Sequence, residues 1–410
     1  MRRRNVRLAT ANLSAAAANR IAKLRRQVTH GILRAFKGVR ESAKSMRATA
    51  WGTVDAGRDL RTHAYVGAVR TARYWGRIHQ QTMPRLGREM AVRRELRVAA
   101  RGDGPIIVGP WLSEVGYEVL YWVPFLRWFS DRYDVDPSRF MVVSRGGVAG
   151  WYRDVAAHYV ELLDLFDVGE FAARNAERQR AGEQKQHGVA ALDREILARV
   201  RARTGLDAAA ICHPSTMFRL LHQFWLGNEA LQYVQEHTRY TRVDPGPFPS
   251  LPPLPARFIA MKFYSGRAIP LSESHVRQLR ALVEHLARRC PIVTLDTGLA
   301  IDEHEDFLFK GIPNVINLRT WLTPQNNLGL QTAVIARATM FVGTCGGLAW
   351  LAPFLGVETL AVHADDALLT PHLYAARQAY REAGAASFTS LDLRALDLAG
   401  LASSRMVEAP

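Results

Sequence analysis

The chain has few cysteines and no long apolar segment. Its three cysteines, Cys212, Cys290 and Cys345, are far apart, so no disulfide framework is predicted. The 13 histidines show neither HxxxH nor HxH spacing, so no metal site is predicted from them. No window approaches 18 uninterrupted apolar residues, which argues against a membrane-spanning helix. We therefore expect a protein of a reducing compartment, the cytoplasm.

The positive charge is confined to the N-terminal quarter of the chain. Residues 1–101 hold 24 Lys and Arg against 5 Asp and Glu, a net of +19, whereas the remaining residues hold 30 against 33, a net of −3. Three interpretations of this basic, mostly helical extension stay open: a solvated segment, an element on an anionic membrane surface, or a nucleic-acid-binding segment. No nucleic-acid reader motif is present, so no specific nucleic-acid partner is predicted. The membrane interpretation implies peripheral association with the inner face.

Alternating strands and helices predict the fold class of the rest of the chain. Apolar runs predict strands, and apolar residues at helical spacing predict helices between them. The predicted strands are 106–108, 140–143, 208–212, 258–263, 292–295, 315–318 and 341–342. This alternation indicates parallel sheets in two α/β domains. Six prolines within residues 244–255 form a stiff connector between them. We predict an extension (1–101), an N-terminal Rossmann-like domain (102–244), a linker (245–256) and a C-terminal Rossmann-like domain (257–400), with the two domains facing a central cleft.

The segment 341–363 is the most informative motif. It reads as a buried strand, a turn of small residues, an amphipathic helix and a second buried strand, and it is expected to be the last crossover of the chain. The turn contains Thr344, Gly346 and Gly347, whose hydroxyl and N–H groups suit an anion at a helix N-terminus. The alternative interpretation is a tightly packed crossover that needs glycine for close approach.

With this motif and domain order, residues 104–395 resemble glycosyltransferases of the two-Rossmann-domain type (GT-B), in particular the heptosyltransferase-like and fucosyltransferase-like groups. The resemblance implies a nucleotide-sugar donor in the C-terminal domain, bound without a metal or other cofactor. Thr344, Gly346 and Gly347 would then contact its diphosphate. Nucleotide-sugar 2-epimerases share this architecture, so the fold does not decide the reaction.

The loops that follow the C-terminal strands supply the other donor-side candidates. Arg267 is the first choice for neutralising the leaving phosphate, since guanidinium matches phosphate bidentately, and Lys262 is the second. Ser265 lies between them. Thr297, Gly298 and Asp302 would border the base and ribose.

The N-terminal domain supplies the candidates for a base. Glu114 follows the first strand, and the apolar wall of Trp111 and Trp122 is expected to raise its pKa. It is preferred to Glu118, which is expected to face the following helix. His213, also between a strand and a helix, is the competing base.

The sequence therefore predicts a metal-independent glycosyltransferase with a glycan or lipid-linked acceptor in polysaccharide or cell-envelope biosynthesis. The alternatives are a nucleotide-sugar 2-epimerase and a non-catalytic scaffold on a membrane surface.

Overall fold

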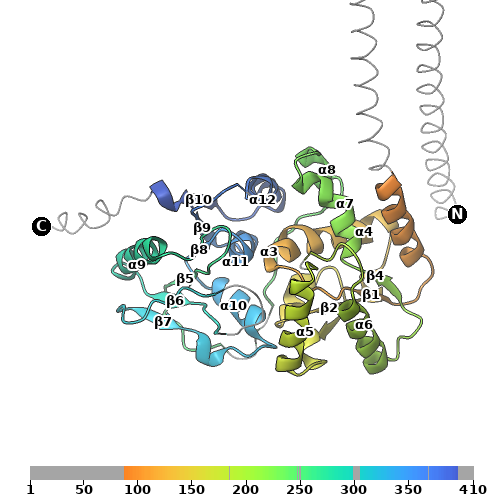
Figure 1. Ribbon diagram of the computed structural model, residues 1–410, viewed down its shortest axis with the longest axis horizontal. Helices are drawn as coiled ribbons and strands as arrows, with labels where there is room; N and C mark the ends of the chain where they lie inside the picture. The colour runs from red at the N-terminus through yellow and green to blue at the C-terminus, as the bar shows by residue number, and fades with distance from the viewer. Residues whose placement is uncertain are drawn as a thin grey trace, which may run out of the picture. The chain divides into compact units, whose positions relative to one another are not determined.

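The computed structural model describes residues 87–183, 185–246, 248, 251–298, 305–367 and 369–395 (Figure 1). The predicted N-terminal extension lies outside the described residues, except for 87–101. Residues 87–100 form a helix whose Val92, Leu96 and Ala99 are buried in the main core. The spacing of these three residues gives the helix one apolar face. This end of the predicted extension therefore packs as part of the compact unit that begins at Arg85.

The N-terminal half is built on a four-stranded parallel sheet with the order β3-β2-β1-β4. Its strands are β1 (Ile106–Val108), β2 (Phe140–Ser144), β3 (His158–Glu161) and β4 (Ala210–Cys212). Its helices are α3 (Val115–Tyr117), which continues through a π-helical turn (Glu118–Trp122) into α4 (Val123–Tyr133), then α5 (Val168–Arg180), α6 (Ala191–Thr204), α7 (Ser215–Trp225) and α8 (Leu231–Gln235). The central strand β1 is completely buried, as expected for a parallel strand covered on both faces.

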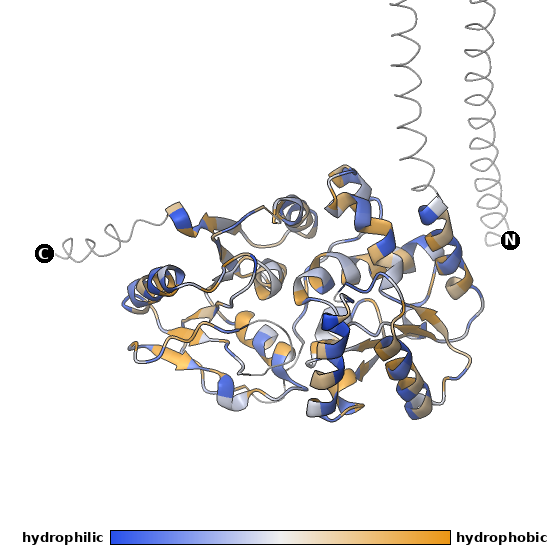
Figure 2. Ribbon diagram, in the orientation of Figure 1, coloured by the Kyte–Doolittle hydropathy of each residue, from blue (hydrophilic) through white to orange (hydrophobic). Residues whose placement is uncertain are grey.

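The C-terminal half is built on a six-stranded parallel sheet with the order β10-β9-β8-β5-β6-β7. Its strands are β5 (Ile259–Lys262), β6 (Ile292–Thr294), β7 (Val315–Asn317), β8 (Met340–Thr344), β9 (Glu358–His363) and β10 (Phe388–Asp392). Its helices are α9 (Glu273–Ala287), α10 (Asn327–Ile335), α11 (Gly347–Leu351), which runs into a 3-10 turn (Ala352–Leu355), and α12 (Thr370–Ala383). In Figure 2, α5 is largely hydrophilic, whereas β6 and β7 are mainly hydrophobic.

Two parallel α/β halves confirm the predicted fold class. Between α8 and β5, the described residues form no helix or strand, and the predicted linker falls in this segment. The prediction that 341–363 is the last crossover is wrong, because α12 and β10 follow it and β10 pairs with β9.

One hydrophobic core joins the halves. It includes Trp111 and Trp122 from the first half and Trp350 and Phe354 from the second. Of the helices that the structure describes, none is both long enough and apolar enough to cross a membrane.

Candidate functional site

The two halves meet where the loops and helices that follow their strands face each other. Gly116 in α3 packs against α11, and a Cβ at Gly116 would lie 2.9 Å from Trp350 Cδ1 and 3.2 Å from the Gly347 nitrogen. Because α3 follows β1 and α11 follows β8, this contact joins the carboxyl ends of both sheets. Such ends are where ligands bind in open α/β folds.

A second contact lies beside the first. The Gly329 N–H donates to Gly146 O at 2.8 Å, and Trp151 Nε1 donates to Thr332 Oγ1 at 3.0 Å. Gly146 follows β2, whereas Gly329 is in the first turn of α10. The two halves therefore contact each other at these points, in the region of the predicted central cleft.

Glu114 lies at the start of α3, at the edge of this region. Its carboxylate accepts a hydrogen bond from Lys185 Nζ at 2.8 Å, and the Glu114 side chain is 53% exposed. Lys185 Nζ also lies 3.5 Å from the centre of the Tyr117 ring. The apolar wall expected around Glu114 is absent: Trp111 and Trp122 stack on each other in the core. A cation, not the two tryptophans, faces this carboxylate.

Arg267 belongs to the other half, but its charge affects the pKa values of Lys185 and Tyr117. It is exposed in the loop after β5. Burial lowers the pKa of Lys185 and the charge of Arg267 adds to that lowering, while the same charge opposes the rise in the Tyr117 pKa that burial causes. Arg267 makes no hydrogen bond or ion pair with the residues described. The charges of the predicted base and of the predicted phosphate-binding cation, which lie in opposite halves, thus both act on Lys185.

The small-residue turn after β8 is only partly free for a ligand. The Thr344 hydroxyl donates to Tyr264 O and accepts from the Tyr264 N–H, both at 3.0 Å. It therefore ties β8 to the loop after β5 instead of facing a phosphate. Gly346 and Gly347 have φ of 150° and 40°, and a Cβ at Gly346 would lie 2.6 Å from the Tyr264 hydroxyl oxygen. Glycine is needed here for this close approach.

Lys262 and Thr297 share one partner, Asp306. Lys262 Nζ lies 2.8 Å from Asp306 Oδ1, and the Thr297 N–H donates to Asp306 Oδ2 at 2.8 Å. The Lys262 side chain is only 13% exposed, so its charge is already compensated. The backbone N–H of Ser265 donates to Glu305 O at 2.7 Å. These contacts hold the loops after β5 and β6 together.

Gly298 lies close to the guanidinium group of Arg319. It adopts φ of 62°, and its Cβ would lie 2.8 Å from the Arg319 guanidinium carbon. Arg319 pairs with Asp296 at 3.2 Å, and Asn317 donates to the same carboxylate. Asp302 lies outside the described residues.

His213 is part of the interior of the N-terminal half. It is 4% exposed, and its Nδ1 accepts from the Ser215 N–H at 3.1 Å. Its Nε2 lies 3.4 Å from Asp193 Oδ1. Nδ1 is thus engaged within one half, and Nε2 is buried without a hydrogen-bond partner among the described residues, so burial argues against a role as base.

Several site residues were not predicted. His372 in α12 lies 2.7 Å from the Tyr121 hydroxyl and 3.3 Å from the Tyr117 hydroxyl, both in the opposite half. Burial lowers the pKa of His372 to about 4. No local pattern marks these residues, because the contact joins positions more than 250 apart in sequence.

Glu118, which was expected to face the following helix, is buried in the interior. It is 1% exposed, and its Oε1 accepts from Ser144 Oγ at 2.6 Å and from the Tyr152 hydroxyl at 2.5 Å. Burial raises the pKa of Glu118 to about 7, and the two hydrogen bonds oppose that rise.

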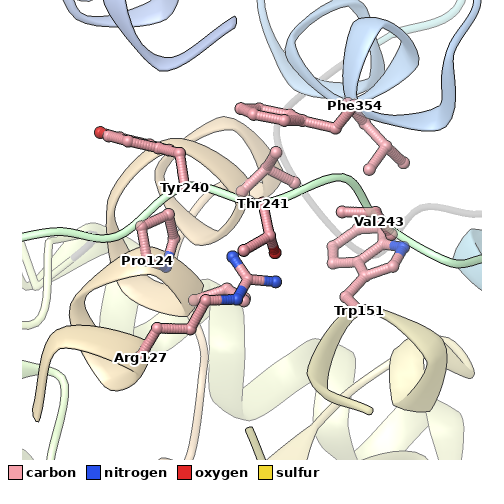
Figure 3. Close-up of a pocket in the computed structure, with 10 residues that line it drawn as sticks. Pro124, Arg127, Trp151, Tyr240, Thr241, Val243 and Phe354 are labelled. Atoms are coloured by element: carbon pink, nitrogen blue, oxygen red, sulfur yellow. The ribbon is translucent and has the colours of Figure 1, made fainter. Parts of the chain in front are cut away.

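A small recess lies between the halves beside the connecting segment (Figure 3). Its lining is mainly apolar and includes Trp151, Val243 and Phe354. The cation in this lining, Arg127, is paired with Asp154 at 2.8 Å. The recess therefore offers no free charge for a phosphate. Among the residues described, no group of three or more His, Cys, Asp or Glu could hold a metal ion.

Neither a protein-family model nor a curated protein matches the chain. Among solved structures, the E. coli heptosyltransferase WaaC with ADP is similar over 73% of this chain and 98% of its own, with 15% identity and a TM-score of 0.40. A glycosyl transferase family 9 protein from Veillonella parvula DSM 2008 is similar over 63% and 80%, with 10% identity and a TM-score of 0.34. A UDP-GlcNAc 2-epimerase from Methanocaldococcus jannaschii covers 74% and 91%, with 10% identity and a TM-score of 0.26.

Both enzyme classes named from the sequence are thus among the matching structures. Likenesses of this degree do not assign the chain to a family or to a reaction.

Proposed function

We propose that the protein is a glycosyltransferase that moves a sugar from a nucleotide-diphosphate donor to a polysaccharide or cell-envelope acceptor. The observation that supports this proposal is that the charges of Glu114, in one half, and of Arg267, in the other, both act on Lys185. A carboxylate and a guanidinium that has no ion pair among the described residues, on loops of opposite halves, suit a reaction in which a hydroxyl is deprotonated while a phosphate departs.

In the proposed reaction, Glu114 accepts the proton of an acceptor hydroxyl. At the same time the oxygen of that hydroxyl bonds to the anomeric carbon of the donor sugar. The bond from that carbon to the donor phosphate breaks, and the electron pair leaves with the diphosphate. In this proposal Arg267 neutralises the leaving group, and the N–H groups of Gly346 and Gly347 donate hydrogen bonds to the diphosphate. Lys262 is paired with Asp306 and His213 is buried in the N-terminal half, so neither is assigned a chemical step.

The donor site is tested by binding of UDP, ADP and GDP, measured by calorimetry on the full chain. We expect one of them to bind, and Arg267→Ala to weaken its binding at least about 10-fold, the loss typical of a charge-assisted hydrogen bond to phosphate. Arg277→Ala is the matched control, since Arg277 is also in the C-terminal half and its side chain is 70% exposed. If none of the three nucleotides binds, or if both variants lose affinity equally, the assignment is wrong.

The reaction is tested with sugars of the nucleotide that binds. Release of nucleoside diphosphate only after an acceptor is added supports transfer. Conversion of the donor to an epimer without acceptor would identify a 2-epimerase instead.

An envelope acceptor rests on the basic charge of residues 1–101, and the proposed location is the cytoplasm, at the inner face of the membrane. Flotation of the full chain with anionic vesicles, but not with neutral ones, is the expected result. Failure to bind anionic vesicles at low salt removes the case for a membrane-bound acceptor.

A further inference from the structure

The loop that carries Glu114 is held by side chains from a distant part of the chain. Four successive carbonyls accept hydrogen bonds, and the donors are Gln186 (to Pro110, 2.8 Å), Arg145 (to Trp111, 3.4 Å, and to Ser113, 3.2 Å) and Arg178 (to Leu112, 2.8 Å). A loop normally satisfies such carbonyls with water or with its own backbone. Here the conformation of residues 110–113 is fixed from outside.

Gln186 is the central member of this set. It is 2% exposed, and it uses both ends of its amide on the same loop. Its Nε2 donates to Pro110 O, while its Oε1 accepts from the Leu112 N–H at 2.9 Å. An amide meets both requirements at once, whereas a carboxylate or an apolar side chain of this length does not.

The orientation of the Gln186 amide is itself fixed. Nε2 also donates to Asp193 Oδ1 at 2.9 Å, and Asp193 Oδ2 accepts from the Ala190 N–H at 2.7 Å. His213 Nε2 lies 3.4 Å from the same Asp193 oxygen that Gln186 contacts. Asp193, which is itself bonded to the Ala190 N–H and lies next to His213, therefore holds the Gln186 amide in one orientation.

Lys185 extends the arrangement to the carboxylate. It precedes Gln186 in sequence, and its Nζ lies 2.8 Å from Glu114 Oε1. One short segment after α5 thus holds both the backbone of the loop and the carboxylate that follows it.

We propose that Gln186 is a positioning residue that fixes the 110–114 loop so that Glu114 faces the acceptor hydroxyl. This role rests on the proposed function. Gln186 does not touch substrate; it acts through the loop. Misplacing a reacting group by about 1 Å costs about 100-fold in rate, so loss of this restraint should act on kcat more than on KM.

The test compares Gln186→Met with Gln232→Met in the full chain. Gln186→Met keeps the length of the side chain but removes its donor and its acceptor, and Gln232 on α8 is an exposed control. Hydrogen–deuterium exchange of peptides covering 109–121 reports on the loop without any substrate. We expect about 10-fold faster exchange of the Leu112 amide in Gln186→Met and no change in Gln232→Met.

Initial rates of diphosphate release give the second measurement. For Gln186→Met we expect kcat to fall about 10- to 100-fold while KM for the donor stays within about 2-fold. Gln186→Glu is a graded variant. Its protonated form can again donate to Pro110 O or to Asp193, so its kcat relative to the wild type should rise as the pH falls.

The outcomes separate the two proposals. If the wild-type chain transfers no sugar from any donor, the proposed function fails and this role fails with it. With an active wild type, unchanged exchange in Gln186→Met overturns the positioning role alone. The positioning role is also overturned if Gln186→Met shows faster exchange of the loop but an unchanged kcat. A variant that does not fold is replaced by Gln186→Glu, whose activity must then follow pH as described.

Discussion

Replacing Glu118 by glutamine should stabilise the protein at alkaline pH and leave it almost unchanged in acid. The Glu118 carboxyl group is buried, and burial raises its pKa from the ordinary 4.5 to about 7. Between these values the folded protein keeps a proton that the unfolded chain releases. The free energy of unfolding therefore falls as the pH rises through this window. The pKa difference of about 2.5, at about 1.36 kcal/mol for each pKa unit, corresponds to about 3 kcal/mol in the free energy of unfolding.

Glu118→Gln removes this dependence because an amide does not ionise. Its Oε1 can still accept from Ser144 and Tyr152, so the buried hydrogen bonds persist. Urea unfolding followed by tryptophan fluorescence should give a variant up to about 3 kcal/mol more stable than the wild type near pH 8.5. Near pH 5 the gain should be below about 1 kcal/mol.

The control for this experiment is Glu273→Gln, whose side chain is 95% exposed and whose stability should not gain with pH. An equal gain for Glu118→Gln at both pH values would refute the reasoning, because it would place the effect in packing and not in ionisation. A loss at pH 8.5 would show that the buried carboxylate is stabilised.

Three further changes test the contacts around the site. Gly116→Val should cost about 1–3 kcal/mol in urea unfolding, because its side chain meets Trp350 and overpacks the contact between the halves; Gly116→Ala should cost less. Burial lowers the pKa of His372 from 6.5 to about 4. Above pH 6.5 this residue is neutral in both the folded and the unfolded chain, so its contribution to the free energy of unfolding is complete there. That contribution is lost as the pH falls toward 4, and the stability difference between the wild type and His372→Gln should shrink by about 3 kcal/mol over this range. Lys262→Met should cost about 2–3 kcal/mol by leaving Asp306 uncompensated, and adding Asp306→Asn should recover part of the loss.

The central strands were predictable because their residues carry the signal. Ile106–Val108 and Ile292–Thr294 are fully buried, and buried parallel strands read as short apolar runs. The edge strands β3 (HYVE) and β10 (FTSLD) are only partly buried and mix polar with apolar residues. Their pairing is set by the neighbouring strand, so the sequence alone did not reveal them.

The site was predictable only as far as it follows from the ends of strands. Glu114 and Arg267 were predicted because each follows a strand of its own half, and the charges of both act on Lys185; their roles stay predictions. Lys185 and Gln186 belong to a polar loop between two helices, about 70 residues from their partners in the chain. Nothing in such a loop shows which carbonyls it will contact. The loop lies between α5 and α6.

The close packing of Gly116 on α11 also has a kinetic consequence. A Cβ at Gly116 would lie 3.2 Å from the Gly347 nitrogen, so if the proposed donor contacts this nitrogen, it should bind a population in which α3 and α11 have separated. The apparent dissociation constant is then the intrinsic value divided by the fraction of open molecules. If opening precedes binding, the observed association rate should level off at high donor concentration, at the rate at which the helices separate. On the proposed function, the close packing at Gly116 would then also limit how quickly a donor can enter.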